Sequence, residues 1–168
     1  QFRSQILLTI SSPENLTNLD AILNKRSRSS EINSGEPLVI WLGYSVHGDE
    51  ISGTNAAMLV AYHLAASQDK DIAEMLQETI IVMEPSINPD GMDRFVNWVT
   101  THKGQVENSD PNHIEHHQNW KTGRTNHFAF DLNRDWLLLS QKESQNRLPF
   151  FHRYQPHVLG DFHEMGAN

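Results

Sequence analysis

The sequence predicts an α/β fold in which a largely parallel sheet carries helices on both faces. Short apolar runs rich in β-branched and aromatic residues alternate with segments of helical periodicity, and this alternation is typical of such folds. The run LVIWLGY at 38–44 is almost continuously apolar, which indicates a strand buried on both faces. With 168 residues, 38% of them hydrophobic, the chain is long enough for one domain with a core.

Each further element follows from a local pattern. A β-rich run predicts a strand over 5–11, and Ser12 before Pro13, followed by leucines at helical spacing, predicts a helix over 12–26. Segment 97–127 is polar and weakly periodic, and its length favours a functional loop or lid over a simple connector. The remaining expected elements are a polar loop (27–37), an apolar, deeply packed helix (52–67), an amphipathic helix (70–78), a strand (79–88), a helix interrupted near Pro149 (143–154) and a buried strand (156–163).

Composition argues against several partners and locations. The formal net charge is −8 and no stripe of lysine and arginine occurs, so a nucleic acid partner is not expected. No apolar stretch approaches the roughly 20 residues that span a bilayer, so membrane insertion is not expected either. The chain has no cysteine, and any transition metal must therefore be bound by histidine and carboxylate. The compartment stays open, with a secreted or periplasmic location as the favoured expectation.

Polar side chains follow three of the predicted strands. The strand at 38–44 runs into His47 and Glu50, the strand at 79–88 runs into the NPDG segment, and the last strand runs into His163. In open α/β sheets, ligands bind at the carboxyl ends of the strands. A functional site is therefore expected at this edge.

The residue types at this edge suit zinc. A catalytic zinc site commonly has two histidines and one carboxylate as ligands and keeps a fourth position for water. His47 and Glu50 supply one histidine and the carboxylate, and His163 supplies the second histidine. A histidine and a glutamate three positions apart are by themselves more often a surface turn with a helix-start glutamate. The second strand that ends in histidine favours the metal site.

Four motifs occur in the order found in one known family. They are HGDE at 47–50, NPDG at 88–91, GRTNHFAFDLNRDW at 123–136 and DFHEMG at 161–166. Together they resemble the zinc carboxypeptidases of the carboxypeptidase A type, and HGDE with DFHEMG is closest to bacterial members. The resemblance implies a three-layer α/β/α fold with a mixed, largely parallel sheet, incomplete at its C-terminal side. Residues 1–168 would be the N-terminal part of a single catalytic domain.

The resemblance also assigns roles to individual residues. It implies that His47, Glu50 and His163 bind Zn²⁺. Asn133 and Arg134 match the pair that binds the substrate's terminal carboxylate, and a planar guanidinium beside an amide suits that task. Without the neighbouring motifs, an isolated asparagine–arginine pair would be interpreted as solvated surface.

Two further residues of the third motif match family positions. Arg124 matches the arginine that polarises the scissile carbonyl and stabilises the oxyanion, where negative charge develops in the transition state. Asp131 matches the aspartate that hydrogen-bonds a zinc-binding histidine, expected here to be His47. The alternative for Asp131 is a strand-end residue that caps a turn, and the two roles are compatible.

Other polar residues have plainer interpretations. NPDG at 88–91 is interpreted first as a turn, because Pro89 fixes φ and Gly91 permits positive φ. Glu164 is interpreted as structural, since neighbouring strand residues point to opposite faces. The histidine-rich run HIEHH at 113–117 is interpreted as loop surface because no strand or helix fixes its geometry.

The function implied by the resemblance is release of the C-terminal residue from a peptide or a peptidoglycan-like substrate. Asp49 replaces a basic residue of the pancreatic enzymes, which suggests a preference for a cationic substrate group. Two alternatives remain open: an N-acyl amino acid deacylase, and a non-catalytic zinc-dependent binder of C-terminal tails.

The family's general-base glutamate lies downstream of the third zinc ligand. Gln1 is no initiator and the last residues follow directly on a strand-like run, so we expect a piece of a longer polypeptide that is inactive alone or nearly so. The oligomeric state is not predicted.

Overall fold

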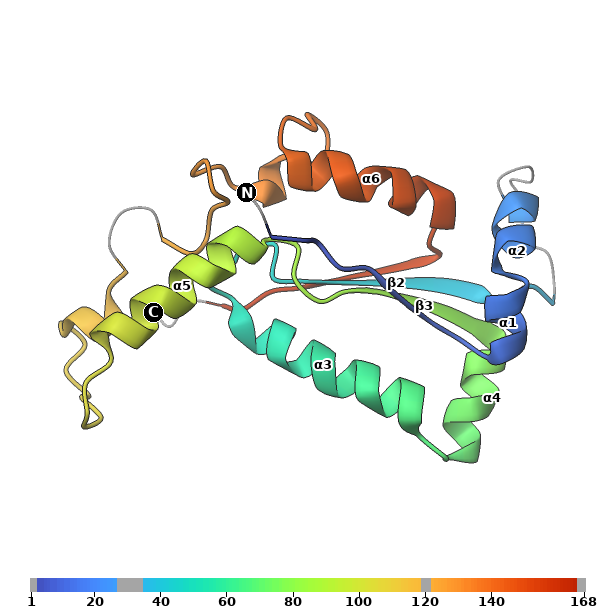
Figure 1. The fold of residues 1–168 in the computed structure, drawn as a ribbon, viewed down its shortest axis with the longest axis horizontal. Coiled ribbons are helices and arrows are strands. Elements are labelled where there is room, and N and C mark those ends of the chain that lie inside the picture. The colour runs from blue at the N-terminus through green and yellow to red at the C-terminus, as the bar shows by residue number, and fades with distance from the viewer. Residues whose placement is uncertain (1–2, 27–34, 119–121, 166–168) are drawn as a thin grey trace.

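A computed structural model describes residues 3–26, 35–118 and 122–165, and within them a four-stranded sheet forms the centre of the molecule (Figure 1). The strand order is β1-β3-β2-β4. β2, β3 and β4 run parallel, and β1 pairs antiparallel with β3. The strands are β1 (Leu8–Ile10), β2 (Leu38–Tyr44), β3 (Thr79–Glu84) and β4 (Val158–Phe162). The predicted α/β class with a mixed, largely parallel sheet is therefore confirmed.

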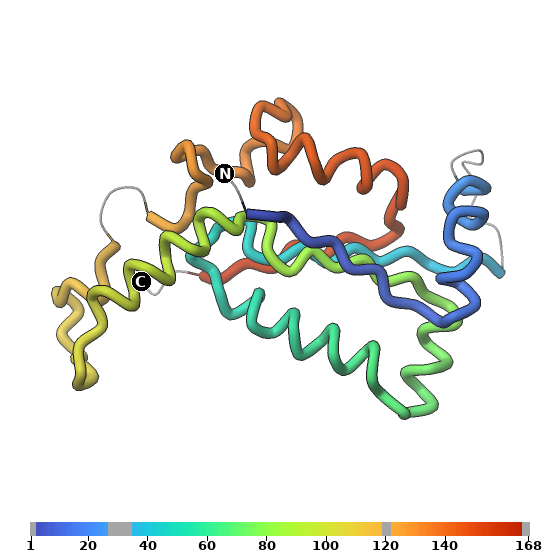
Figure 2. The backbone as a smooth tube through the Cα atoms, viewed as in Figure 1, coloured from blue at the N-terminus to red at the C-terminus, as the bar shows by residue number. Residues whose placement is uncertain are grey.

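Helices cover both faces of the sheet, which gives three layers (Figures 1 and 2). On one face, α2 (Leu19–Arg26) and α6 (Lys142–Tyr154) pack through Leu23 and Tyr154 onto a cluster that contains Trp41. On the other face, α3 (Ile51–Ala66) and α4 (Lys70–Glu78) pack through Ala57 and Leu76 onto side chains of the same strands. Alternate residues of β2 and β3 thus face different helical layers.

Burial differs among the parallel strands: β3 is buried throughout, β2 is buried at four of its seven residues, and β4 is largely exposed. Every residue of β3 is buried, and β2 lies between β3 and β4. β4 lies at the end of the sheet order with most of its residues exposed, so the expectation of a strand buried on both faces is wrong there. Among its side chains, Phe162 stacks on Tyr44 of β2 with ring centroids 4.4 Å apart. This contact fixes the end of β4 beside the end of β2.

Helix α3 is less buried than its apolar sequence suggests. Within it, Ala57 and Leu64 are buried, whereas Met58, Leu59 and Tyr62 are 64%, 73% and 73% exposed. The expected deep packing is therefore wrong. One narrow stripe of the helix, with Ala57 and Leu64, packs against the sheet.

The NPDG segment begins a helix. α5 spans Pro89–His102, with Asn88 as its N-cap and Pro89 in its first turn. Proline is favoured at this position because the first N–H groups of a helix lack intrahelical partners. This helix corrects two expectations. NPDG is not a simple turn, and the long polar loop does not begin at residue 97. α5 projects beyond the carboxyl edge of the sheet (Figure 2).

Other boundaries differ modestly from expectation. The first strand is shorter than 5–11, and the helix over 12–26 is two helices, α1 (Pro13–Thr17) and α2, separated at Asn18. α6 continues through Pro149 instead of being interrupted there. Two 3-10 turns, η1 (Ile114–His116) and η2 (Leu132–Arg134), interrupt the loops, and the polar loop expected over 27–37 falls mainly outside the described residues. No helix of the described residues is both long and apolar enough to cross a bilayer.

Candidate metal centre

The loop after β2 places a buried histidine at the carboxyl edge of the sheet. Ser45 adopts a positive φ of 54°, and its hydroxyl donates to the carbonyl of His47 at 2.8 Å. The backbone N–H of Glu50 donates to the same carbonyl at 3.2 Å, which closes a tight turn. His47 is consequently only 3% exposed, although it lies in a loop. Glu50 follows as the N-cap residue of α3.

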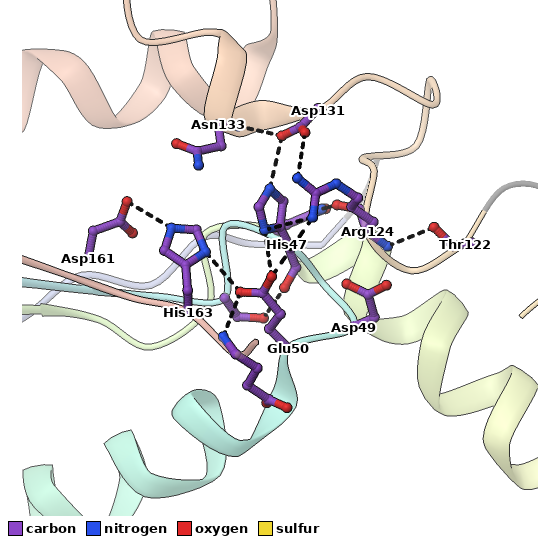
Figure 3. Close-up of polar contacts among 12 residues, drawn as sticks. His47, Asp49, Glu50, Thr122, Arg124, Asp131, Asn133, Asp161 and His163 are labelled. Atoms are coloured by element: carbon purple, nitrogen blue, oxygen red, sulfur yellow. Dashed lines mark hydrogen bonds and ion pairs between the residues drawn. The ribbon is translucent and has the colours of Figure 1, made fainter. Parts of the chain in front are cut away.

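The structure brings His47, Glu50 and His163 together (Figure 3). Nδ1 of His47 lies 2.7 Å from Oε1 of Glu50, and Nδ1 of His163 lies 2.9 Å from Oε2. One potential ligand atom from each residue lies within 4.8 Å of the others. Two imidazole nitrogens thus face one carboxylate, as a two-histidine, one-carboxylate metal site requires.

Each imidazole uses its other nitrogen on an outer carboxylate. Nε2 of His47 lies 3.1 Å from Asp131, and Nε2 of His163 lies 3.1 Å from Asp161 (Figure 3). With a metal ion between Nδ1 and Glu50, these outer carboxylates would accept a hydrogen bond from the proton on Nε2, as carboxylates behind metal-binding histidines do. Two histidines and a glutamate are ligands that zinc prefers, and carboxylates commonly lie behind zinc-binding histidines as Asp131 and Asp161 do here.

Charge interactions and burial shift the pKa values of Asp131 and His163. Partial burial raises the pKa of Asp131, but the hydrogen bond from Asn133 N and the nearby His47 and Arg124 lower it more, so its pKa lies below the usual value. Burial lowers the pKa of His163, but Asp161 and Glu50 outweigh that effect and leave its pKa raised. Asp131 is therefore held as an acceptor for the histidine N–H.

Arg124 lies at the edge of the same cluster. One guanidinium nitrogen donates to Oδ2 of Asp131 at 3.0 Å, and the other lies 3.4 Å from Nδ1 of His47 and 4.0 Å from Oε1 of Glu50. Its side chain is 44% exposed, so the cation is fixed by Asp131 and still accessible from solvent. This geometry places a permanent positive charge beside His47 and Glu50.

Asn133 and Arg134 lie on the turn that Asp131 caps. The backbone N–H of Asn133 donates to Oδ1 of Asp131 at 2.9 Å, and Arg134 is exposed, with a guanidinium hydrogen bond to the carbonyl of Asn133. Asp131 therefore performs both roles considered for it, as a turn cap and as the partner of His47. Arg134 does not contact the histidine cluster in this structure.

Two acidic residues near His163 differ in what they contact. The carboxylate of Glu164 accepts hydrogen bonds from the N–H and hydroxyl of Ser52, so it caps α3 and has the structural role expected of it. Asp161 was missed by sequence reasoning. The available signal was its spacing, because residues two apart on a strand point to the same side.

The remaining polar candidates lie elsewhere. Of the described residues, His47, Glu50 and His163 form the one group close enough to hold an ion, and the run at 113–117 forms none. There, Glu115 accepts from Gly104 N at 3.0 Å and holds the loop to the end of α5. Asp49 accepts a hydrogen bond from Gln118 at 3.3 Å, which links this loop to the metal centre.

Comparison with known proteins identifies the family. A family model described as zinc carboxypeptidase matches residues 2–158. The chain belongs to the zinc carboxypeptidase family. This zinc carboxypeptidase chain is 29% identical over 145 residues to "Carboxypeptidase 2" of Trichophyton rubrum, a match that covers 86% of the chain and 22% of the relative. It is 31% identical over 124 residues to "Carboxypeptidase D" of Drosophila melanogaster, with 73% of the chain and 7% of the relative covered.

Solved structures share the fold of this zinc carboxypeptidase chain. A metallo-carboxypeptidase from Burkholderia cenocepacia superposes with a TM-score of 0.61 at 16% identity, over 97% of this chain and 33% of that one. Carboxypeptidase A from Helicoverpa armigera superposes with a TM-score of 0.54 at 14% identity, over 98% and 38% respectively. The chain thus spans about a fifth of the first curated relatives and about a third of these solved chains.

Proposed function

We propose that the whole protein is a zinc-dependent carboxypeptidase that releases the C-terminal residue of a peptide or a peptidoglycan-like substrate. One observation carries this proposal. Nδ1 of His47, Nδ1 of His163 and the carboxylate of Glu50 converge from the carboxyl ends of two parallel strands. Membership of the zinc carboxypeptidase family agrees with this chemistry.

His47, Glu50 and His163 would hold the metal. When bound there, zinc supplies a Lewis acid that polarises a carbonyl oxygen and lowers the pKa of a bound water. Asp131 and Asp161 keep the two imidazoles in the tautomer whose Nδ1 can bind the ion. The carboxylate of Glu50 offsets part of the charge of the ion in a site that is closed on the His47 side.

Arg124 would stabilise the negative charge that develops on the scissile carbonyl oxygen. A fixed cation is effective in this role because Asp131 orients it before the substrate arrives, so little reorganisation is needed during the reaction. Its side chain reaches the cluster from the loop opposite α3 (Figure 3). The donor groups that face solvent can then meet a substrate oxygen.

Asn133 and Arg134 would bind the free carboxylate of the substrate. An exopeptidase has to distinguish a chain end from an internal peptide bond, and a charge-assisted pair with a guanidinium provides that distinction. The exposure of Arg134 supports such a role, because its guanidinium can turn toward a bound carboxylate. The family's general-base glutamate would come from beyond His163, so hydrolysis is proposed for the whole protein.

Two experiments test the proposal. Elemental analysis of the dialysed chain should give close to one zinc per chain, and His47→Ala and His163→Ala should each abolish binding. His63→Ala, which changes an exposed histidine of α3, is the matched control and should keep the metal. Zinc that persists in both ligand variants would refute the site.

The second experiment compares substrates of the whole protein. If Asn133 and Arg134 recognise the carboxylate, a peptide with a free C-terminus should be cleaved, and the same peptide with an amidated C-terminus should stay intact. Cleavage of N-acyl amino acids but not of peptides would indicate a deacylase. Zinc-dependent binding of C-terminal peptides without any hydrolysis would indicate the non-catalytic alternative.

A further inference from the structure

The first turn of α5 is bonded to the loop that carries His47. The backbone N–H groups of Ile87 and Asn88 donate to the carbonyls of Tyr44 and Ser45 at 2.9 and 3.1 Å. Tyr44 is the last residue of β2 and Ser45 follows it, and they lie three and two residues before His47. The start of α5 is therefore fixed relative to the first candidate zinc ligand.

Two glycines show how closely this turn approaches its neighbours. A Cβ atom at Gly48 would overlap the backbone of Gly91 and Met92, and one at Gly123 would lie 2.5 Å from Cβ of Phe95 and 3.2 Å from Cβ of Asp49. The loop of His47, the start of α5 and the loop of Arg124 thus meet backbone to backbone. A shift of one segment would move the others.

Two side chains of α5 bind the loop of Arg124. Asn88 is fully buried; its side-chain oxygen accepts from Gly91 N, and its Nδ2 donates to the carbonyl of Arg124 at 3.1 Å. Arg94 donates from one guanidinium nitrogen to the carbonyl of Thr122 at 2.9 Å and from the other to the carbonyl of Asn126 at 3.1 Å. The loop carbonyls before, at and after Arg124 are all bonded to one helix.

The choice of side chains suits this task. Arg94 also lies 3.4 Å from the carbonyl and the hydroxyl of Thr125. Its guanidinium thus donates to neutral oxygen atoms of this one loop. A planar guanidinium presents five N–H donors in a fixed fork and can bind several carbonyls of one turn at once. An ammonium group would not reproduce that pattern.

We propose that Asn88 and Arg94 are positioning residues that hold Arg124 beside the metal centre. The proposal rests on the proposed function, in which Arg124 contacts the substrate carbonyl. It assigns to the NPDG segment a role beyond helix capping. The first link is the backbone bonds from Ile87 and Asn88 to Tyr44 and Ser45. The second is the side-chain bonds from Asn88 and Arg94 to the loop at 122–126.

Amide hydrogen exchange of residues 122–131 tests this directly in the chain. Arg94→Met removes all the guanidinium donors, and Asn88→Asp keeps the oxygen that caps α5 but loses the Nδ2 donor to Arg124. In both variants the amide hydrogens of this segment should exchange about tenfold faster, because the opening of the loop costs less free energy. Arg153→Met, which removes an exposed arginine of α6 that pairs with Asp20, should leave the exchange unchanged.

A second measurement separates positioning from general stability. Phenylglyoxal should modify Arg124 several-fold faster in both variants, read by mass spectrometry of the peptide that contains it, while the midpoint of global unfolding stays close to that of the parent. If Arg94→Met does not fold, Asn88→Asp decides alone.

The two readouts need neither zinc nor catalysis, so their outcome is independent of the zinc test above. Exchange and modification rates within twofold of the parent in folded Asn88→Asp and Arg94→Met would overturn the positioning role. If the chain binds no zinc but the variants still loosen the loop, the positioning role stands and only the proposed function is contradicted.

Discussion

Nε2 of His47 lies 3.1 Å from Oδ1 of Asp131, and this contact joins the candidate metal centre to the loop that carries Arg124. The second oxygen of the same carboxylate accepts from the guanidinium of Arg124 at 3.0 Å. The turn of Asn133 is bonded to Oδ1 as well. One carboxylate therefore orients a metal ligand, a cation and the turn proposed to bind the substrate.

Replacing this carboxylate by an amide should weaken zinc binding. Asp131→Asn keeps the size of the side chain but removes the charge, so the N–H of His47 loses its strong acceptor. Outer carboxylates of this kind typically contribute about 10- to 100-fold to metal affinity. Competition with a chromophoric chelator should therefore show a loss of that order. Asp71→Asn, on exposed α4, is the control and should bind zinc as the parent does; equal affinities in both variants would contradict the role of Asp131.

Zinc should also stabilise the fold. The three candidate ligands come from the loop after β2 and the end of β4, which unfolding separates, so zinc binds the folded chain in preference. At a free zinc concentration of a hundred times Kd, the free energy of unfolding should rise by about 2.7 kcal/mol. Chemical denaturation with and without zinc measures this. His163→Ala should show no such rise, and His63→Ala should show the full rise.

The sequence predicted the convergence of His47, Glu50 and His163 better than it predicted the elements around them. His47, Glu50 and His163 follow the carboxyl ends of strands that the apolar runs marked clearly, and parallel pairing then places them together. The helix at Pro89–His102 was missed because Asn88 and Pro89 favour turns and helix starts alike, and the choice depends on packing against Gly48 and Gly123.

Burial was the least predictable property. An apolar composition indicates that a segment is able to pack, but it does not determine how much of it finds a partner. Leu59 of α3 and Leu159 of β4 belong to such segments and are 73% and 47% exposed. Contacts distant in sequence, such as Asn88 with Arg124, likewise depend on the assembled fold.

The stability of the chain should depend on pH through His157. Burial lowers the pKa of this imidazole, and the nearby Arg26 lowers it further, whereas the charge of Glu36 raises it less. Val39 N donates to Nδ1 at 2.9 Å, so protonation of Nδ1 would remove the acceptor that joins the start of β2 to the residue before β4.

The folded pKa of His157 therefore lies below the unfolded value of about 6.5. The unfolded chain binds more protons below that value, so the free energy of unfolding should fall as the pH drops below about 6.5 and should not change through this group above it. Denaturation at a series of pH values measures the slope. His157→Asn can present an oxygen to Val39 N without titrating, and its stability should fall less steeply. A parallel decline in both proteins would exclude His157 as the cause.

The glycine contacts at the start of α5 should be sensitive to a single methyl group. At Gly91, a Cβ atom would lie 2.5 Å from Nδ2 of Asn88 and 2.6 Å from the carbonyl of Thr125. These are backbone and buried atoms that cannot move independently, so Gly91→Ala should cost about 1–3 kcal/mol of unfolding free energy, as overpacking does. Denaturant unfolding measures the loss.

Gly53→Ala is the matched control because it adds the same methyl group to another helix of the site. Its nearest neighbour would be a ring carbon of Tyr44 at 3.4 Å, an ordinary contact distance, and alanine is favoured over glycine within a helix by up to about 1 kcal/mol. Gly53→Ala should therefore leave stability unchanged or raise it. If the two substitutions had the same effect, the close approach of α5 to the loops of His47 and Arg124 would not be what makes Gly91 necessary.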